Sequence, residues 1–172
     1  NVTQYAYNKQ NQLTTVTDPL GNVTTYGYDA VGNMTTTTDA NGNVVTYAYD
    51  SEGRMVSMTD GMGNTWSYEY NANGQLVKTT DPLGGVTETT YDANGRMASA
   101  TDANGETTHY TYDGVGNQIG VKDALGNSDV SVYDANGNLV SYTDREGNVT
   151  TYAYDKNNRL TSETDALGGV TS

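Results

Sequence analysis

The chain has 172 residues, of which 34% are hydrophobic, and its formal net charge at pH 7 is −13. This acidity argues against nucleic acid, heparin-like polymers and anionic membrane surfaces as partners, because each of them needs a basic patch on the protein. The lack of cysteine excludes disulfides and thiolate metal sites, and the lack of a long apolar run argues against insertion into a membrane as a helix.

A 21-residue repeat runs along the whole sequence. Its marker is the dipeptide Tyr-Asp or Tyr-Asn, and a Thr-Asp pair keeps the same period between the markers. Eight units fill nearly every position, so we expect one repeat array over residues 1–172 with no separate catalytic domain. The marker tyrosines are Tyr7, Tyr28, Tyr49, Tyr70, Tyr91, Tyr112, Tyr133 and Tyr154.

Two turns per unit are predicted by the pattern Asp-x-x-Gly. Aspartate at the first position of a type I turn accepts a hydrogen bond from the backbone two residues on, and glycine at the fourth position tolerates a positive φ. Asparagine, which can do either job, replaces the aspartate at Asn8 and Asn71 and the glycine at Asn11 and Asn158. The repeat signature is represented by Tyr28, Asp29, Gly32, Asp39, Gly42, Tyr49, Asp50, Gly53, Tyr91, Asp92, Gly95, Tyr154 and Asp155.

The segments between the turns have the length and composition of β-strands. Residues 22–28 and 33–38 are examples, rich in threonine, tyrosine and valine. Because only short turns join successive segments, neighbouring strands must pair antiparallel. The sequence therefore predicts an all-β fold. Tandem β-hairpins form a continuous antiparallel ribbon of roughly sixteen strands that twists or spirals.

The odd period of 21 imposes a constraint on the tyrosines. If both turns are three-residue loops, Tyr28 lies opposite Met34 in its hairpin. Side chains alternate between faces along a strand, so identical turns alone place Tyr26 and Tyr47 on opposite faces. We therefore predict that one turn per unit has an even loop, or that one strand carries an extra bulge. The tyrosines then stack as a ladder on one face.

The tyrosine face also carries leucine or methionine from the other arm of each hairpin. Aromatic side chains over these residues, and over one another, form stabilising cross-strand pairs. The pattern is interrupted at Thr89, Gln118 and Ser131, where we expect looser packing. Aromatic rings that remain exposed are an alternative surface for stacking on sugar rings, and the candidates are Tyr26, Tyr47, Trp66 and Tyr68.

Candidates for catalysis and metal binding are few. His109 is the only histidine and occupies a strand position held elsewhere by threonine or serine, which favours a surface substitution over a catalytic base. Ca²⁺ needs six to eight converging oxygens, and a turn such as Asp-Ala-Asn-Gly offers too few. We expect no cofactor and no enzymatic activity. A calcium site and a hydrolase that uses His109 are the lesser alternatives.

Residues 91–97, Tyr-Asp-Ala-Asn-Gly-Arg-Met, and residues 101–105, Thr-Asp-Ala-Asn-Gly, resemble the units of the YD or RHS repeat family. The resemblance covers nearly every residue. It implies kinship with RHS polymorphic toxins, shell components of insecticidal toxin complexes and animal teneurins. In those proteins the repeats form a β-sheet strip that spirals into a hollow shell, often around a cargo.

The resemblance favours a structural role. The leading hypothesis is a section of an extracellular shell, stalk or fibre that encapsulates or displays a toxin or partner domain outside this chain. Its location is then secreted or at the cell surface. Self-association through edge strands or neighbouring repeats is expected, because an unpaired strand is a template for pairing. The alternative is a carbohydrate-binding or cell-surface adhesion module that uses the exposed tyrosine and tryptophan rows.

Overall fold

The computed structural model describes residues 2–172 and divides into two compact units, Asn1–Val86 and Thr87–Ser172. Seventeen β-strands account for its regular structure. No helix capable of crossing a membrane occurs among the described residues. The predicted all-β class is confirmed, and the prediction that the array behaves as a single domain stays a prediction.

The strands are five or six residues long in most hairpins. The first unit contains β1 (Gln4–Tyr7), β2 (Leu13–Thr17), β3 (Val23–Tyr28), β4 (Met34–Thr38), β5 (Val44–Tyr49), β6 (Met55–Thr59), β7 (Thr65–Tyr70) and β8 (Leu76–Thr80). The next strand, β9 (Val86–Tyr91), starts at the last residue of the first unit. The second unit continues with β10 (Met97–Thr101), β11 (Thr107–Tyr112), β12 (Gln118–Lys122), β13 (Ser128–Tyr133), β14 (Leu139–Thr143), β15 (Val149–Tyr154), β16 (Leu160–Thr164) and β17 (Val170–Thr171).

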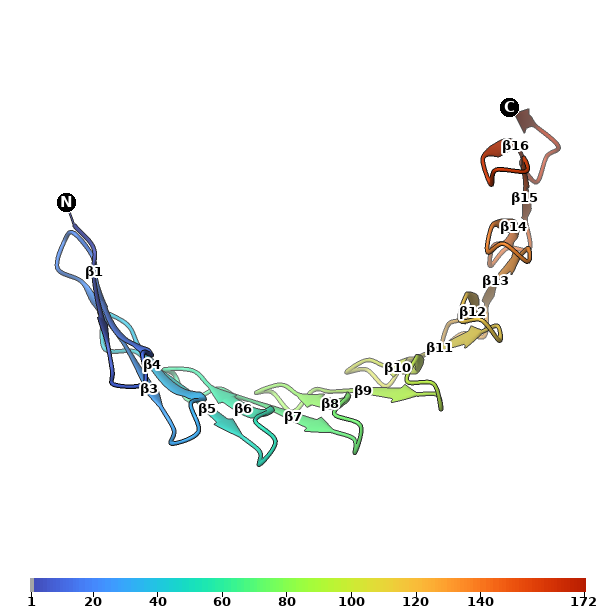
Figure 1. Cartoon of the computed structure of the whole chain (residues 1–172). Coiled ribbons are helices and arrows are strands. Elements are labelled where there is room, and N and C mark those ends of the chain that lie inside the picture. Colours follow the sequence, from blue (N-terminus) through green and yellow to red (C-terminus); the bar gives the residue numbers. More distant parts are fainter. Residues whose placement is uncertain (1) are drawn as a thin grey trace. The chain divides into compact units, whose positions relative to one another are not determined.

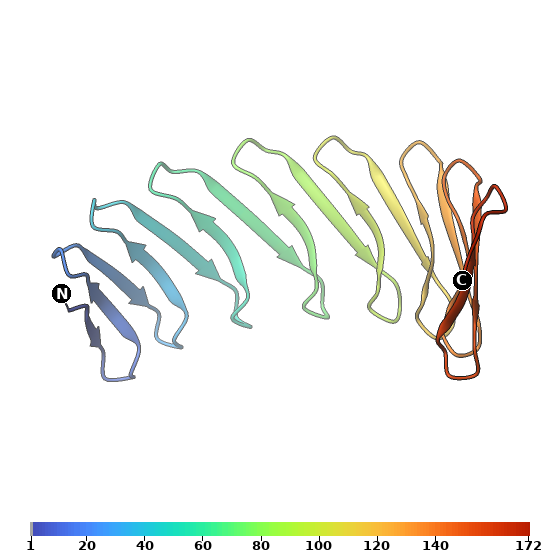
Figure 2. The same ribbon diagram turned by 90° about the horizontal axis from the view of Figure 1, so that it is seen from above.

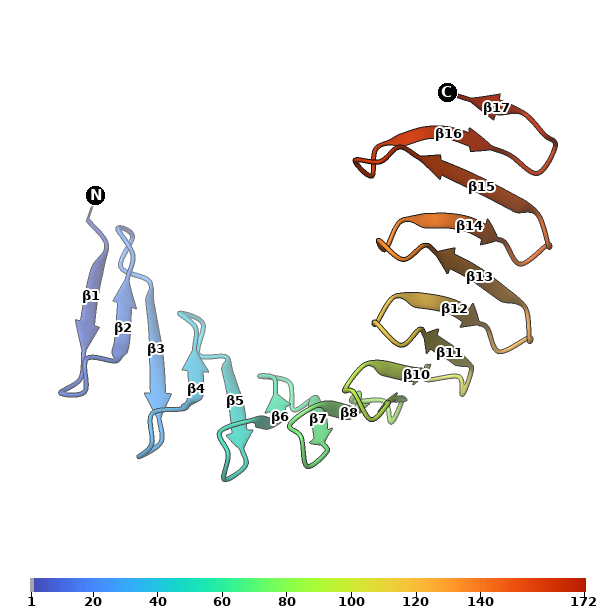
Figure 3. The same ribbon diagram turned by 45° about the vertical axis from the view of Figure 1, so that its right-hand side comes forward.

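Within each unit the strands form an antiparallel meander. Strands β1 to β8 pair in chain order, as do strands β9 to β17 (Figure 1). In each unit the strands form a single-layer sheet (Figures 2 and 3). A single layer follows directly from the short turns, which leave no segment long enough to cross over the sheet.

The turns have the predicted geometry. At the turn of residues 18–22, the Gly21 N–H donates to the Asp18 carbonyl at 3.0 Å and the Asp18 N–H donates to the Asn22 carbonyl at 2.9 Å. Fourteen glycines at the closing position have a positive φ, and the two asparagines that replace glycine, Asn11 and Asn158, have φ values of 62° and 59°. The substitution of asparagine for glycine is thus explained by backbone conformation.

A β-bulge supplies the extra residue that was predicted to keep the tyrosines of successive repeats on one face. Gly27 lies opposite Thr36 and Tyr28 lies opposite Met34, so Thr35 is an extra residue in β4. Both turns of the repeat have three-residue loops, which excludes the even-loop alternative. The same shift in strand register occurs in the other hairpins next to the marker tyrosine, which is the second tyrosine of its repeat. These tyrosines are Tyr7, Tyr49, Tyr70, Tyr91, Tyr112, Tyr133 and Tyr154.

The bulge keeps the tyrosines of successive repeats on one face. Tyr26 lies opposite Thr37, and Thr37 lies opposite Val45 on the next strand. Tyr47 is two residues beyond Val45 and so points to the same side. The prediction of a uniform tyrosine face is confirmed.

The sheet has no core. None of residues 2–172 is buried, and the strand side chains are half-buried or exposed. Stability therefore comes from the strand hydrogen bonds, the turns and lateral contacts between neighbouring side chains.

The closing glycine of a turn gives a direct test of this geometry. Gly95 has a φ of 81°, and its N–H donates to the Asp92 carbonyl. We expect Gly95→Val to destabilise its hairpin by about 1 to 2 kcal/mol, because a side chain in the left-handed region approaches the following carbonyl. Gly95→Asn is the matched control and should cost much less, as at Asn11 and Asn158. Thermal melting of both variants measures the difference, and equal melting temperatures would contradict the turn assignment.

Candidate functional site

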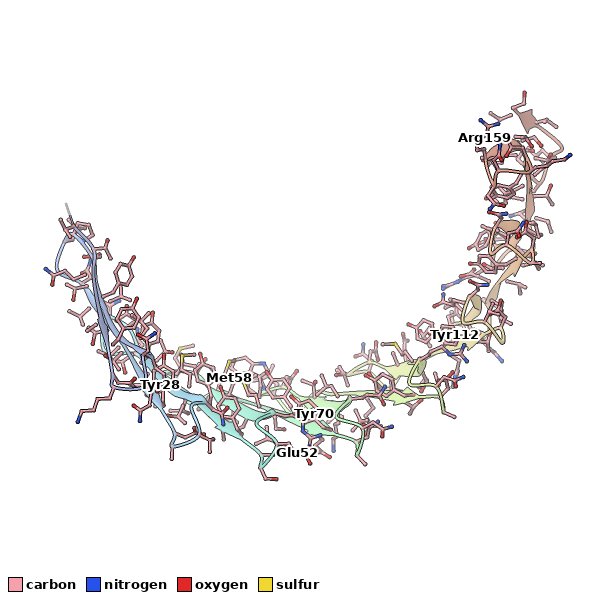
Figure 4. The ribbon with its side chains drawn as sticks, viewed as in Figure 1. Tyr28, Glu52, Met58, Tyr70, Tyr112 and Arg159 are labelled. Atoms are coloured by element: carbon pink, nitrogen blue, oxygen red, sulfur yellow. The ribbon has the colours of Figure 1, made fainter. Side chains whose placement is uncertain are left out.

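The second tyrosine of a repeat fastens its hairpin to the preceding one. The Tyr28 hydroxyl donates to the Leu13 carbonyl at 2.8 Å, and the Tyr49 hydroxyl donates to the Met34 carbonyl at 2.9 Å. In each pair the acceptor lies 15 residues earlier in the chain, in the preceding repeat. The same bond recurs from Tyr70 to Met55 and from Tyr154 to Leu139. Figure 4 labels Tyr28 and Tyr70. Sequence reasoning predicted packing for these tyrosines and missed the hydroxyl bond.

The second tyrosines also meet their predicted partners across the hairpin. A leucine or methionine lies directly opposite each of them in seven hairpins, and in the eighth Gln118 lies opposite Tyr112. The pairs are confirmed at Leu13, Met34, Met55, Leu76, Met97, Leu139 and Leu160.

The first tyrosine of each repeat, which precedes the marker tyrosine by two residues as Tyr26 and Tyr47 do, does not stack on the equivalent tyrosine of the next repeat. Tyr47 lies opposite Met58, which lies opposite Trp66 on the following strand. The next tyrosine-bearing strand is two strands away, about 10 Å at the usual strand spacing. The predicted ladder is wrong in this respect, because every second strand places a different residue between the tyrosines. Met58, on β6, is labelled in Figure 4.

The aromatic residues considered for sugar binding lie on this face of the first unit. Tyr26, Tyr47, Trp66 and Tyr68 are all half-buried by their neighbours. They occupy three successive hairpins and are joined by ordinary strand pairing. Their stacking on glycans stays a prediction.

The leading aspartate of a turn accepts hydrogen bonds through Oδ1, and also through Oδ2 where asparagine or arginine stands at the fifth position. In the turn that Asp18 starts, Oδ1 accepts from the N–H groups of Leu20 at 2.8 Å and Asn22 at 2.9 Å, and Oδ2 accepts from Asn22 Nδ2 at 2.6 Å. The asparagine side chain and then its backbone N–H are the main causes that lower the pKa of Asp18, and the same holds for Asp39. The partner at the fifth turn position was missed by sequence reasoning, although asparagine stands there in many turns.

Arginine at the fifth turn position links one hairpin to the next. Arg96 Nε donates to Asp92 Oδ2 at 2.7 Å, and Arg96 Nη1 donates to the Asp113 carbonyl at 3.1 Å. The guanidinium carbon lies 4.6 Å from the centroid of the Tyr112 ring. Arg54 repeats the arrangement in the first unit, 5.0 Å from the next tyrosine ring. These contacts combine a charge-assisted hydrogen bond with a cation–π interaction.

The signature residues therefore have three different structural roles. The tyrosines end their strands and face the preceding hairpin or the opposite strand, the aspartates start turns, and the glycines close them. The structure places Tyr28, Tyr49, Tyr91 and Tyr154 at strand ends, Asp29, Asp39, Asp50, Asp92 and Asp155 at turn starts, and Gly32, Gly42, Gly53 and Gly95 at turn ends.

The remaining candidates form no reactive constellation. His109 is exposed on β11 opposite Lys122. Among residues 2–172, no three histidine, cysteine or acidic side chains are grouped as metal ligands. The turn carboxylates are already engaged as hydrogen-bond acceptors, so a calcium site remains a prediction without a donor set to support it.

Looser packing at the interrupted positions stays a prediction. Thr89 lines a surface pocket of about 380 Å³, and Gln118 and Ser131 line another of about 210 Å³.

Comparison with known families finds a match over most of the chain. The family model described as RHS Repeat matches residues 7–44, 30–65, 49–86, 91–128 and 133–170. No match was found among curated proteins.

Solved structures of similar fold come from toxin complexes. A crystal structure of TcdB2-TccC3 is 18% identical with a TM-score of 0.70, and the match covers 95% of this chain and 11% of that chain. For TcdB2-TccC3-Cdc42 the identity is 22%, the TM-score is 0.65, and the coverage is 91% and 9%. A structure of the Photorhabdus luminescens Tc holotoxin pore is 22% identical with a TM-score of 0.64, and the match covers 91% of this chain and 9% of that chain. At these identities the likeness shows the fold, and the present chain spans about a tenth of the chains it matches.

The hydroxyl bond between repeats can be tested with Tyr49→Phe. This change removes the donor to the Met34 carbonyl and leaves the ring in place. We expect a loss of about 0.5 to 1.5 kcal/mol in the free energy of unfolding, measured by urea denaturation. Tyr47→Phe is the matched control, because among the described residues the Tyr47 hydroxyl has no hydrogen bond. An equal loss in both variants would show that the hydroxyl bond contributes nothing specific.

Acid should loosen the turns. The folded pKa values of Asp18, Asp39, Asp134 and Asp144 are lowered, chiefly by the fifth-position asparagine. Their contribution to stability is therefore complete above the unfolded pKa of about 3.9 and is lost as the pH falls through the lower folded values. Far-UV circular dichroism across an acid titration should show unfolding below about pH 4.

The control for acid unfolding replaces these four aspartates by asparagine. Asn71 already leads a turn, and its Oδ1 accepts hydrogen bonds from the N–H groups of Asn73 and Gln75 in the same pattern. The substituted chain should unfold at lower pH than the parent, and an unshifted acid transition would contradict the role given to the turn carboxylates.

Proposed function

The chain belongs to the RHS repeat family, and we propose that this structural scaffold forms a section of the wall of a shell, stalk or fibre. The observation that carries the proposal is the recurring hydrogen bond from a tyrosine of one hairpin to the backbone of the preceding hairpin. The hydroxyl of Tyr28, Tyr49 or Tyr70 reaches back to the previous repeat at 2.8 to 2.9 Å. A contact of this kind can be repeated indefinitely, so a wall extends by adding identical hairpins.

The recurring polar side chains support a structural role over a catalytic one. The turn aspartates accept hydrogen bonds within their own loops, as Asp18 does. Arg54 and Arg96 are engaged by a carboxylate, a carbonyl and a tyrosine ring. Side chains committed in this way stiffen the sheet and are unavailable as a base or nucleophile.

We further propose that the scaffold encloses or displays a toxin or partner domain lying outside residues 1–172, in a secreted or cell-surface protein. Support comes from the solved chains of similar fold, which are parts of Tc toxin complexes. A polar, acidic surface also suits an exposed wall, because a net charge of −13 keeps such a sheet soluble.

Self-association is proposed through strands added beside the first hairpin. All four residues of β1 are exposed, and Tyr5 and Tyr7 are 59% and 57% exposed. At the other end, the Arg159 side chain is 75% exposed, whereas those of Arg54 and Arg96 are 26% exposed under the following hairpin. Each terminal hairpin thus presents the contacts that interior hairpins use on their neighbours.

The test is light scattering of the purified chain across a concentration series. We expect the mean mass to rise with concentration, with elongated particles in negative-stain images. Tyr5→Lys places a charge on the exposed strand and should suppress the rise, because charged side chains on edge strands block pairing. Gln10→Lys adds the same charge at an exposed turn and should leave association unchanged. A monomeric mass at every concentration would contradict the fibre form of the proposal.

A further inference from the structure

The repeat is broken most heavily between residues 118 and 145. Gln118 replaces a leucine or methionine, Asp129 replaces threonine, valine or tryptophan, and Ser131 replaces the first tyrosine. Tyr142 and Arg145 stand where no other repeat has a tyrosine or an arginine. These residues come from three adjacent strands, β12, β13 and β14, and the turn that follows (Figure 3).

The strand register brings the altered residues together on the tyrosine face. Asp129 lies opposite Val121, and Ser131 lies opposite Tyr142. Because Ser131 is small, the volume that a tyrosine side chain fills in other repeats is open here. The resulting pocket of about 210 Å³, which we call the polar notch, is lined by Gln118, Gly120, Val121, Asp129, Ser131 and Tyr142.

The surroundings of the polar notch are negatively charged. Arg145 is shared between two carboxylates, with Nε 3.4 Å from Asp129 and Nη1 3.3 Å from Asp123 Oδ2. Both separations are long for a charged hydrogen bond, and the arginine side chain is 43% exposed. Burial first, then the negative charge of Asp129, and then a hydrogen bond to its carboxylate raise the pKa of the Tyr142 hydroxyl. One guanidinium therefore stands against two carboxylates, which disfavours an anionic ligand.

The chain itself shows how this kind of environment is filled elsewhere. The Arg96 guanidinium has a carboxylate oxygen at 2.7 Å, a carbonyl oxygen at 3.1 Å and a tyrosine ring centroid at 4.6 Å. The polar notch offers the same kinds of group, with the carboxylate of Asp129, the side-chain oxygens of Gln118 and Ser131, and the ring of Tyr142. These are the kinds of group that a planar cation binds.

We propose that the polar notch binds a guanidinium group presented by an arginine-containing segment of a partner protein. The site goes beyond the role of the array as a wall, because a wall needs no interruption of its repeat. A neutral sugar would use the hydroxyl and amide groups but would gain nothing from the net negative charge. Its binding is the competing outcome in the test.

The test is a nuclear magnetic resonance titration of the isotope-labelled chain with N-acetyl-arginine amide. We expect saturable shifts of the backbone amide signals of Gln118, Asp129, Ser131 and Tyr142. N-acetyl-citrulline amide has nearly the same shape without the charge, and it should bind about tenfold more weakly or less. Equal binding of the citrulline probe or of methyl glucoside, or no shifts with arginine at millimolar concentration, would overturn the proposal.

Two variants locate the binding in the polar notch. Asp129→Asn removes the carboxylate charge and should raise the Kd about tenfold, whereas Glu163→Gln removes an exposed carboxylate of the same face one repeat later and should not change it. Ser131→Tyr restores the repeat residue, fills the pocket and should abolish binding without lowering the melting temperature. Unchanged arginine binding in Ser131→Tyr would place the ligand elsewhere and refute the site.

Discussion

The extra residue beside the second tyrosine of each repeat is the constraint on which this architecture depends. A hairpin repeat of odd length reverses its faces from one unit to the next when both turns are alike, and both turns are alike here. The bulge at Thr35 and its equivalents restores the face in every hairpin. Only then can a second tyrosine meet the carbonyl of the preceding repeat, as Tyr49 meets Met34. Local irregularity is what makes the long-range order possible.

The bulge and the turns also set the slope of the strands within each unit. Following residues that lie directly opposite one another leads from Tyr26 across Thr37 to Val45. The equivalent of Tyr26 in the next repeat is Tyr47, which lies two residues further along the strand of Val45. The register thus advances by two residues for every two strands. With about 3.3 Å per residue and 4.8 Å per strand, such a stagger corresponds to strands inclined by about 35° to the direction of growth. An inclined ribbon is the geometry that allows a sheet to wind.

The sequence predicted the turns down to single residues, because turn chemistry is local. The asparagines with positive φ at Asn11 and Asn158 are examples. It predicted that a parity change was needed but left open whether a loop or a bulge supplied it, since both satisfy the same hydrophobic pattern. The ladder of tyrosine rings was wrong because residues such as Met58 intervene. The polar notch was foreseen only as loose packing, since Ser131 and Tyr142 become neighbours only through the register.

The absence of a core among residues 2–172 explains how such a scaffold can hold a singular site. In a globular domain, replacing a half-buried tyrosine by serine disturbs packing on every side. In a single-layer array the effect reaches only the adjacent strands, because each hairpin contacts its neighbours alone. At Ser131 the residue directly opposite is Tyr142, on the adjacent strand. The repeat can therefore be altered in one hairpin without weakening distant ones, and a wall can acquire a binding position wherever its periodicity is interrupted.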